Sequence, residues 1–463
     1  MIISASDLGA LYSTQLMETL QQWVVSMSSS QIRSFRHTAT VIALEAETAL
    51  CEVAAAVDKE SEVVARQREG EKKRKGPKTG NPRLKELDTK AQEVKRRQSK
   101  LKSFIKEFVD GYVNIKFLYA PILTKPCRVF VHRFRDLDPN IRAECVRSIG
   151  LWLRKYPDHF LDAHYLRYVG WVLSDANNHV RLEAVKALSG VYDQAEYIPS
   201  LTHFTERFKS RLLEMATSDV DLSIRVAVIR VLGDIEGHFP LEDEEKEKLC
   251  LLLFDEEAKV RKAVSQFVRA VWEEEVEAQV GTQSKPSDKD KERTGIKVLA
   301  QLLVKWGKAL DTLAGETSES EIGDDSRDGE DATNGTSRRA NRRREVIALI
   351  GPDDRGRVAL AVDALWEEVE IVSEWEELLD LLLLDHSASG EESQLEATPR
   401  ARVRANGKKR NDDFLVDEAW RLEEVEESIL LEVLVAALGR AKEEAVGGKK
   451  VCSSVLNCFL VLY

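Results

Sequence analysis

A short pattern, Asp-x4-[Ile/Val]-Arg, recurs four times between Asp136 and Val268, and it constrains the fold more than any other feature. An apolar residue or a cysteine stands three positions after each arginine, and an aliphatic residue stands seven positions after it. Successive arginines are separated by 39, 44 and 36 residues, close to the roughly 40–47 residues of HEAT-type helical pairs. The copies are Asp136–Arg142, Asp175–Arg181, Asp219–Arg225 and Asp255–Arg261.

Each residue type in the pattern has a physical role. The aspartate falls in the turn between two helices, where it can accept hydrogen bonds from free amides at the start of the second helix. The arginine one turn later can pair with the aspartate of its own or the adjacent copy. The apolar positions share a helical face that one helical pair cannot bury alone, so neighbouring pairs must stack. Chance recurrence is the alternative, but four in-phase copies favour a solenoid.

The composition is compatible with helices throughout the chain. The 463 residues include only 24 glycines and 11 prolines, while 43% are hydrophobic and 32% are charged. Helix-forming residues are abundant, and strand-type alternation is rare. We therefore predict an all-α fold, a HEAT-repeat-like α-solenoid with a long basic N-terminal helical segment and disordered acidic linkers.

Changes of pattern along the chain predict its organisation. Helices are expected at residues 6–25, 31–57, 294–314, 338–384 and 415–446, and a long basic helix is expected to turn near residues 76–77 and 80–82. The expected parts are 1–63, N-terminal helices; 64–112, the basic helical segment; 113–128, an insertion; 129–279, the repeats; 280–340, a linker helix and a disordered acidic linker; 341–446, further helices; and 447–463, an aberrant tail.

Charge is distributed unevenly along the chain. The formal net charge is −12, yet the stretch from Arg66 to Lys102 carries fifteen Lys or Arg against five Asp or Glu. Such a basic stretch can neutralise DNA phosphates without reading base sequence. A solvated helix face, or a nuclear localisation signal at residues 72–75, is the alternative. The candidate DNA-binding residues are Lys72, Lys73, Arg74, Lys75, Lys78, Arg83, Arg96 and Arg97.

The sequence contains no recognisable catalytic or metal-binding motif. Phosphate-binding loops, nucleophile elbows, zinc-protease helices and kinase motifs are absent from it. None of the six cysteines forms a CxxC pair or has a histidine at zinc-finger spacing, so free thiols in a reducing compartment are expected. We therefore expect neither an enzyme, a cofactor nor a metal.

No membrane-targeting or membrane-spanning signal stands out. The N-terminal residues lack the basic region and long apolar run of a signal peptide. No apolar stretch reaches the roughly 20 residues that span a bilayer. We expect an intracellular soluble protein without a membrane partner.

Several long motifs, in order, resemble one family of chromosomal proteins. Phe130–Asp136 (FVHRFRD) with Ile141-Arg142 resembles the opening of the stromalin conservative domain, and Tyr165–Trp171 (YLRYVGW) continues that pattern. Phe204–Lys209 (FTERFK) follows in the same order, while Leu20–Trp23 and Gln31–Thr40 resemble the segment that precedes the domain. The likeness covers about residues 16–112 and 129–272, so the repeats at 129–279 are identified as the stromalin conservative domain.

The resemblance implies a HEAT-repeat scaffold subunit of cohesin in the nucleus, on chromosomes. Members dock on the kleisin subunit, contact the ring ATPase subunits indirectly, and bind DNA or chromatin in sister chromatid cohesion. They also bind regulators that carry Tyr/Phe-x-Phe motifs, in a pocket rich in aromatic residues and arginine. The family often has an acid near Ala163, where this chain instead has Asp162 beside it. The matching pocket residues are Phe134, Arg135, Leu166, Tyr168, Trp171 and Arg207.

Another HEAT-repeat scaffold is the alternative to a cohesin subunit. A karyopherin-like transport receptor or a phosphatase scaffold would have similar helical repeats. The motifs at Phe130–Asp136 and Tyr165–Trp171 argue against both. An enzyme ranks third, because no nucleophile, base or metal set is visible.

Residues 112–128 depart from the family pattern and resemble a translated intron. In the family, a helix ending in glycine leads directly into Val-Phe-Val-His-Arg, and here Gly111 and Val129 flank the extra stretch. Its codons permit splice signals at both ends and a length divisible by three. A genuine loop is the alternative, since Pro121 and Pro126 are loop residues. The ending after Val451 can likewise be read-through into an intron.

Overall fold

The computed structural model describes residues 1–75, 82–109, 129–281, 287–319, 356–384, 386 and 420–447. Within these ranges every regular element is a helix, which confirms the prediction of an all-α fold. The chain is divided into two compact units. The first comprises Met1–Met215 and Asp234–Phe239, and the second comprises Ala216–Gly233 and Pro240–Tyr463.

The first unit begins with three short helices instead of the single helix expected at 6–25. They are α1 (Ile2–Asp7), α2 (Ala10–Ser13) and α3 (Leu16–Ser28). Gly9 adopts a left-handed conformation with φ of 74° and separates α1 from α2. Thr14 is extended and separates α2 from α3. The helical spacing of apolar residues continued across both breaks, which is why the sequence predicted one helix.

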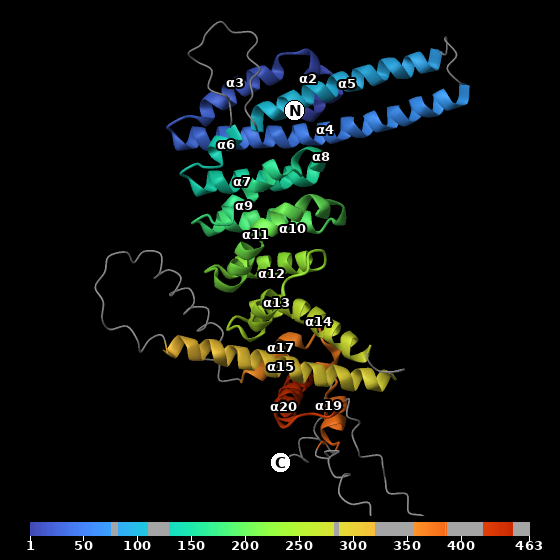
Figure 1. Ribbon diagram of the computed structural model, residues 1–463. Helices are drawn as coiled ribbons and strands as arrows, with labels where there is room; N and C mark the ends of the chain where they lie inside the picture. Colours follow the sequence, from blue (N-terminus) through green and yellow to red (C-terminus); the bar gives the residue numbers. More distant parts are fainter. Residues whose placement is uncertain are drawn as a thin grey trace, which may run out of the picture. The chain divides into compact units, whose positions relative to one another are not determined.

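The longest element is α4 (Arg33–Lys75), which lies side by side with α5 (Pro82–Val109) in the first unit (Figure 1). The expected helix end at residue 57 was wrong, and the boundary drawn between residues 63 and 64 falls inside α4. This stretch has no proline and only Gly70 as a glycine. Ion pairs one helical turn apart, Glu62–Arg66 and Glu69–Lys73, help its exposed part to remain helical.

The repeats of the first unit follow the basic hairpin of α4 and α5. Their helices are α6 (Val129–Arg133), α7 (Pro139–Lys155), α8 (Pro157–Phe160), α9 (Ala163–Val172), α10 (Asn178–Tyr192), the 3-10 turn η1 (Ala195–Tyr197) and α11 (Ile198–Ser218), most of which belongs to this unit. Helix α7 packs against both α4 and α10. The hairpin therefore stacks on the repeats within one unit.

The second unit continues with helices of the same kind. They are α12 (Leu222–Glu236), most of which belongs to this unit, α13 (Asp243–Cys250), the 3-10 turn η2 (Leu251–Phe254), α14 (Ala258–Val280), α15 (Asp288–Glu319), α17 (Arg357–Leu365), α18 (Glu370–Ser373), α19 (Trp375–Leu382) and α20 (Glu424–Gly447). The helix expected at 338–384 is divided, where described, into α17, α18 and α19. The helix expected from residue 415 begins at Glu424.

Helix α15 is longer and more buried than the linker helix expected at 294–314. Its start is stabilised by reciprocal hydrogen bonds between Ser287 and Asp290. Because the surrounding residues are polar, the sequence was interpreted as a linker at this point and the helix start was missed. It ends at Glu319, inside the segment that was expected to be a disordered acidic linker. Its side chains Leu299 and Trp306 are almost fully buried, so α15 forms part of the core of the second unit.

The apolar positions of the repeats form the core, as predicted. The residue before each arginine and those three and seven positions after it are at most 1% exposed: Ile141, Cys145, Ile149, Val180, Ala184, Leu188, Ile224, Val228, Leu232, Val260, Val264 and Val268. Together with the all-helical architecture, this burial confirms a HEAT-repeat-like array. It also places Cys145 in the core as a free thiol, Cys51 is likewise free and buried, and Cys250 is buried.

Some expectations fall on residues outside the described ranges. These are the insertion at 113–128, the acidic linker beyond Glu319, and the tail after Gly447. Among the described helices, none is both long and apolar enough to cross a membrane.

Candidate functional site

A polar ladder connects the turns of neighbouring repeats in the first unit. The Asp136 carboxylate accepts a hydrogen bond from the Asp138 amide at 2.9 Å, and Asp138 caps α7 by accepting from the Asn140 amide at 3.0 Å. Asp175 accepts in the same way from the Asn177 amide at 2.9 Å. The repeated aspartate therefore lies in the turn, as predicted, but the helix cap itself stands two residues later.

Arg142 links the turn of its own copy to the turn of the next copy. Arg142 Nη1 donates to the Asp136 carbonyl oxygen at 2.8 Å, while its Nε and Nη2 donate to both carboxylate oxygens of Asp175, each at 2.8 Å. Burial alone would raise the pKa of Asp175, but the hydrogen bonds from Arg142 and the Asn177 amide outweigh it and lower that pKa. The bond to Asp175 raises the pKa of Arg142 further. Both shifts favour the charged pair.

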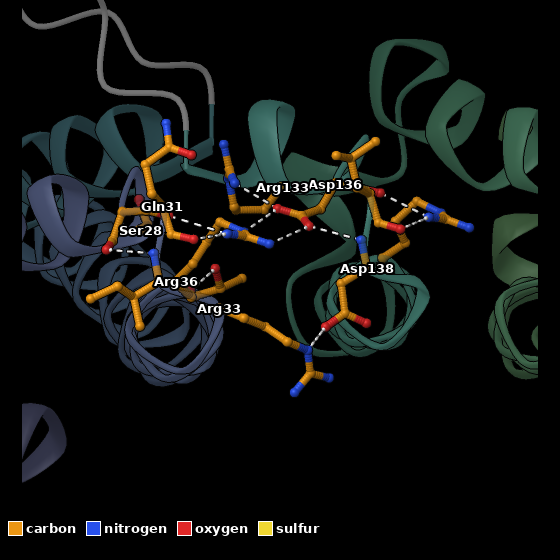
Figure 2. A network of polar contacts seen from close by, with 12 residues as sticks. Ser28, Gln31, Arg33, Arg36, Arg133, Asp136 and Asp138 are labelled. Atoms are coloured by element: carbon orange, nitrogen blue, oxygen red, sulfur yellow. Dashed lines mark hydrogen bonds and ion pairs between the residues drawn. The ribbon is translucent and has the colours of Figure 1, made fainter.

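The ladder begins one element earlier than the sequence pattern indicated. Arg36 Nε on α4 donates to Asp136 Oδ2 at 2.9 Å, and Arg133 Nη1 donates to the same oxygen. Figure 2 shows both guanidinium groups pointing toward the Asp136 carboxylate. A separate pair joins Arg33 to Asp138, across the same two turns.

The second unit repeats the arrangement with its own residues. Arg225 donates to the Ala216 carbonyl oxygen at 3.0 Å and pairs with the buried carboxylate of Asp255. Arg261 Nη1 donates to the Asp255 and Glu256 carbonyl oxygens at 2.7 and 2.9 Å. The predicted arginine–aspartate ladder is therefore present in both units.

An aromatic surface forms where α6 meets α9 in the first unit. We define it by Phe134, Arg135, Arg167, Tyr168 and Trp171. The rings of Phe134 and Tyr168 meet edge to face with centroids 5.1 Å apart, and Tyr168 meets Trp171 in the same way at 5.6 Å. Phe134 and Tyr168 are buried, whereas Trp171 is 39% exposed. The two buried rings therefore support an indole that solvent can reach.

Two guanidinium groups flank the exposed indole. The Arg135 guanidinium lies 5.7 Å from the centre of the Trp171 ring, and that of Arg167 lies 5.4 Å from it. Arg167 also lies 5.2 Å from the Tyr168 ring. These distances are within the range of cation–π attraction. Sequence reasoning missed Arg167, although it stands four residues before Trp171 and so shares its helical face.

The structure brings together only part of the predicted pocket. Phe134, Arg135, Tyr168 and Trp171 are in ring or cation–π contact. Leu166 is 1% exposed and therefore belongs to the core beneath. Arg207, on α11, lies 5.5 Å from the Phe208 ring. The Phe208 ring packs closely against Gly170 of α9, where an added Cβ would lie 2.3 Å from the ring. Phe208 thus lies between Arg207 and the helix that carries Tyr168 and Trp171.

Asp162 has a local structural role at the start of α9. Its side chain accepts a hydrogen bond from the His164 amide at 2.8 Å, which makes it the helix cap. The acid that stands beside Ala163 therefore stabilises the helix that carries Tyr168 and Trp171.

The predicted DNA-binding residues lie along the basic hairpin formed by α4 and α5. The described side chains of Lys72, Lys73, Arg83 and Arg96 are exposed, and that of Arg97 is half-buried. Several also pair with acids of the hairpin: Lys73 with Glu69 at 2.8 Å, Arg96 with Glu93 at 3.1 Å and Arg97 with Glu60 at 2.8 Å. Arg74 and Lys75 belong to α4, but their side chains, like the whole of Lys78, lie outside the described part.

Family profiles match two segments of the chain. Residues 1–90 match the STAG domain, which includes α1 to α4 and the start of α5. Residues 135–209 match the stromalin conservative domain, which includes most of the aromatic surface and the first two turns of the ladder.

Curated relatives match somewhat more than half of the chain. Cohesin subunit psc3 of Schizosaccharomyces pombe is 35% identical over 270 residues, which are 58% of this chain and 26% of that protein. Sister-chromatid cohesion protein 3 of Arabidopsis thaliana is 30% identical over 56% of this chain and 22% of its own length. Cohesin subunit SA-1 of Xenopus laevis is 32% identical over 58% and 20%, respectively. The chain thus spans between a fifth and about a quarter of the length of these relatives.

A solved structure shares the fold over a longer range. The structure of cohesin subunit Scc3 from Z. rouxii, residues 88–1035, is similar over 94% of this chain and 42% of its own, with a TM-score of 0.64 and 20% identity. The similarity therefore extends to the helices beyond residue 280, where the sequence motifs had ended. With both named domains matched in order along the chain, it is similar to cohesin subunits of the stromalin family.

Proposed function

We propose that the chain acts as a non-catalytic HEAT-repeat scaffold within cohesin, on chromosomes in the nucleus. In this role it binds the kleisin subunit, contacts the ring ATPase subunits indirectly, and presents surfaces for DNA and for regulators. The names of the relatives, which are cohesin subunits and a sister-chromatid cohesion protein, support this assignment over a karyopherin-like receptor or a phosphatase scaffold.

The exposed indole of Trp171 is the observation that carries the regulator-binding proposal. An aromatic side chain that is 39% exposed has apolar area available to a partner. The buried rings beneath it hold it in place, so little conformational entropy is lost when a partner binds. The adjacent guanidinium groups can stack on an incoming ring or pair with its flanking acids. A Tyr/Phe-x-Phe segment has the required chemistry.

The basic hairpin supports a second proposed function, DNA binding. Exposed Lys72, Lys73, Arg83 and Arg96 lie along two neighbouring helices, in a stretch with an excess of basic residues. Side chains that point into solvent can contact phosphates without rearrangement of the core. Because phosphate contacts carry no base readout, the expected binding is independent of sequence and sensitive to salt.

Affinity purification of the tagged chain from nuclei tests the scaffold role. Recovery of a kleisin and the ring ATPases is the expected result. Recovery of transport cargo with a small GTPase, or of a phosphatase catalytic subunit, in place of these proteins would overturn the proposal.

A further inference from the structure

A cleft of about 420 Å³ opens on the first unit between α1, α4 and α5. None of the residues of the aromatic surface or the ladder lines it. Its floor is a stripe of small aliphatic side chains on one face of α4, namely Val53, Ala56 and Val57. Ile3 on α1 forms the opposite lip and is 45% exposed. The floor is thus apolar, with Ala56 exposed between the buried side chains of Val53 and Val57.

Carboxylates surround this apolar floor. Glu52 and Glu60 stand at the two ends of the stripe, about 12 Å apart along the helix at 1.5 Å per residue. Arg97 Nη2 donates to Glu60 at 2.8 Å and closes that end. Lys155 contacts Glu52 through one carboxylate oxygen, Oε1. Within the described ranges, the exposed Asp7 carboxylate on α1 has no ion-pair partner.

The charge of the lining favours a cationic ligand. Three carboxylates and one guanidinium line the cleft, and that guanidinium is already engaged by Glu60. Asp7 and the second oxygen of Glu52 remain as acceptors in the lining. A cation placed there would lie next to the aliphatic floor, so the complementary ligand has an apolar group beside a positive charge.

The size of the cleft limits the conformation of that ligand. A volume of about 420 Å³ lies within the roughly 300–1,000 Å³ of small-ligand pockets. An α-helix is about 10–12 Å in diameter with its side chains, whereas an extended segment is narrower and fits a small cleft more readily. In an extended chain, residues i and i+2 point to the same side. An aliphatic residue at i and a cation at i+2 would therefore enter the cleft together.

We infer that this cleft binds an extended segment of a partner protein in which a small aliphatic residue is followed two positions later by Lys or Arg. The aliphatic side chain covers Val53, Ala56 and Val57, and the cation meets Glu52 and Asp7. This inference does not rest on the proposed functions, because the aromatic surface and the exposed basic residues Lys72, Lys73, Arg83 and Arg96 take no part in it. Arg97 lines the cleft, but it is engaged there by Glu60. The α1 and α4 walls lie inside the segment that matches the STAG domain.

Saturation-transfer NMR and calorimetry on the full chain test the inference with one pair of probes. Acetyl-Ala-Val-Ala-Arg-Ala-amide should bind, and acetyl-Ala-Val-Ala-Glu-Ala-amide should not. Ala56→Phe should abolish binding of the arginine peptide, because the new ring fills the floor from an exposed position and leaves the core intact. Equal binding of both peptides, or unchanged binding to the Ala56→Phe variant, would overturn the inference.

Charge variants separate recognition from structure. Glu52→Gln with Asp7→Asn should weaken the arginine peptide by about tenfold or more, as expected for loss of charge-assisted hydrogen bonds. Lys155→Met is the matched control, because it removes the same Lys155–Glu52 ion pair but keeps the Glu52 charge. It should bind the peptide as tightly as the natural chain or more tightly. If Lys155→Met loses binding to the same extent, the ion pair has only a structural role and the inference fails.

Discussion

Arg36 pairs with Asp136 at 2.9 Å although the two residues are one hundred positions apart. Arg36 Nη1 also donates to the Ser30 and Gln31 carbonyl oxygens, which stand six and five positions before it. Arg142 contacts Asp136 and Leu137 with the same spacing. Ser30 accepts from the Ile32 amide at 3.2 Å, as Asp136 accepts from Asp138. The turn before α4 is therefore a further copy of the repeat, with serine in place of aspartate.

This arrangement makes Arg36 more important to stability than its neighbour Arg33. The side chains of Arg36 and Asp136 are 17% and 2% exposed, whereas Arg33 is 59% exposed in its pair with Asp138. Arg36→Met should lower the free energy of unfolding by about 2 kcal/mol, the scale of a lost hydrogen bond to a buried charge. Arg33→Met is the control and should cost less than about 1 kcal/mol. Urea denaturation measures both, and equal losses would contradict the ladder.

Removing the exposed indole should weaken motif-bearing regulators. Trp171→Ala should lower affinity for a Tyr/Phe-x-Phe peptide by about 2 kcal/mol, or roughly 30-fold, because central aromatic anchors dominate such interfaces. Isothermal titration calorimetry on the folded variant gives this value. Trp23→Ala removes another exposed tryptophan of the first unit and should leave the affinity unchanged. An unaltered affinity of the Trp171→Ala variant would show that the aromatic surface does not bind the motif.

Reversal of charge on the basic hairpin should reduce DNA binding without changing sequence preference. Glutamate at Lys72, Lys73, Arg74 and Lys75 should weaken all duplexes alike and flatten the salt dependence, because fewer counterions are released. Fluorescence anisotropy across a salt series measures both effects.

A matched pair of reversals controls for net charge. Lys72→Glu with Lys73→Glu should have a larger effect than Lys289→Glu with Lys291→Glu, two exposed lysines of α15 in the second unit. If both pairs change the salt slope equally, only the overall charge of the chain matters.

The ladder should make stability sensitive to acid. The pKa of Asp175 is lowered from its ordinary 3.8, so the folded state binds its proton less readily than the unfolded chain. Its contribution is therefore present above about pH 4 and is lost as the pH falls through the lowered value. The stability difference between the natural chain and Asp175→Asn should be constant near pH 7 and should shrink below pH 4. Chemical denaturation at several pH values measures it, and a constant difference down to pH 2.5 would contradict the paired state.

The stretch between α5 and α6 leads to a prediction about the transcript. If residues 112–128 are a translated intron, mature messages should join the codon of Gly111 directly to that of Val129. Amplification and sequencing of the message across this junction decides the matter. Messages that uniformly retain these codons would show that the stretch is a true part of the protein.

Sequence alone determined the helical repeats and the residues in their core. A pattern with apolar residues at positions such as Ile141, Cys145 and Ile149 defines one face of one helix, and that face must be buried wherever the helix lies. The turn aspartates were likewise predictable, because their hydrogen bonds reach amides only two residues away. The spacing of residues along the chain therefore determines which helix face is buried and which turn residues bond to nearby amides.

Tertiary structure decided which side chains of an aromatic-rich segment face solvent and which copies join the ladder. Leu166 and Trp171 both belong to the same short helix, yet one is buried and the other exposed, because packing against α7 and α10 covers one face only. Ser30 joined the ladder because α4 packs against α7 and brings Arg36 to Asp136. Contacts between residues so distant in sequence depend on how the helices stack, and a local sequence pattern does not predict that stacking.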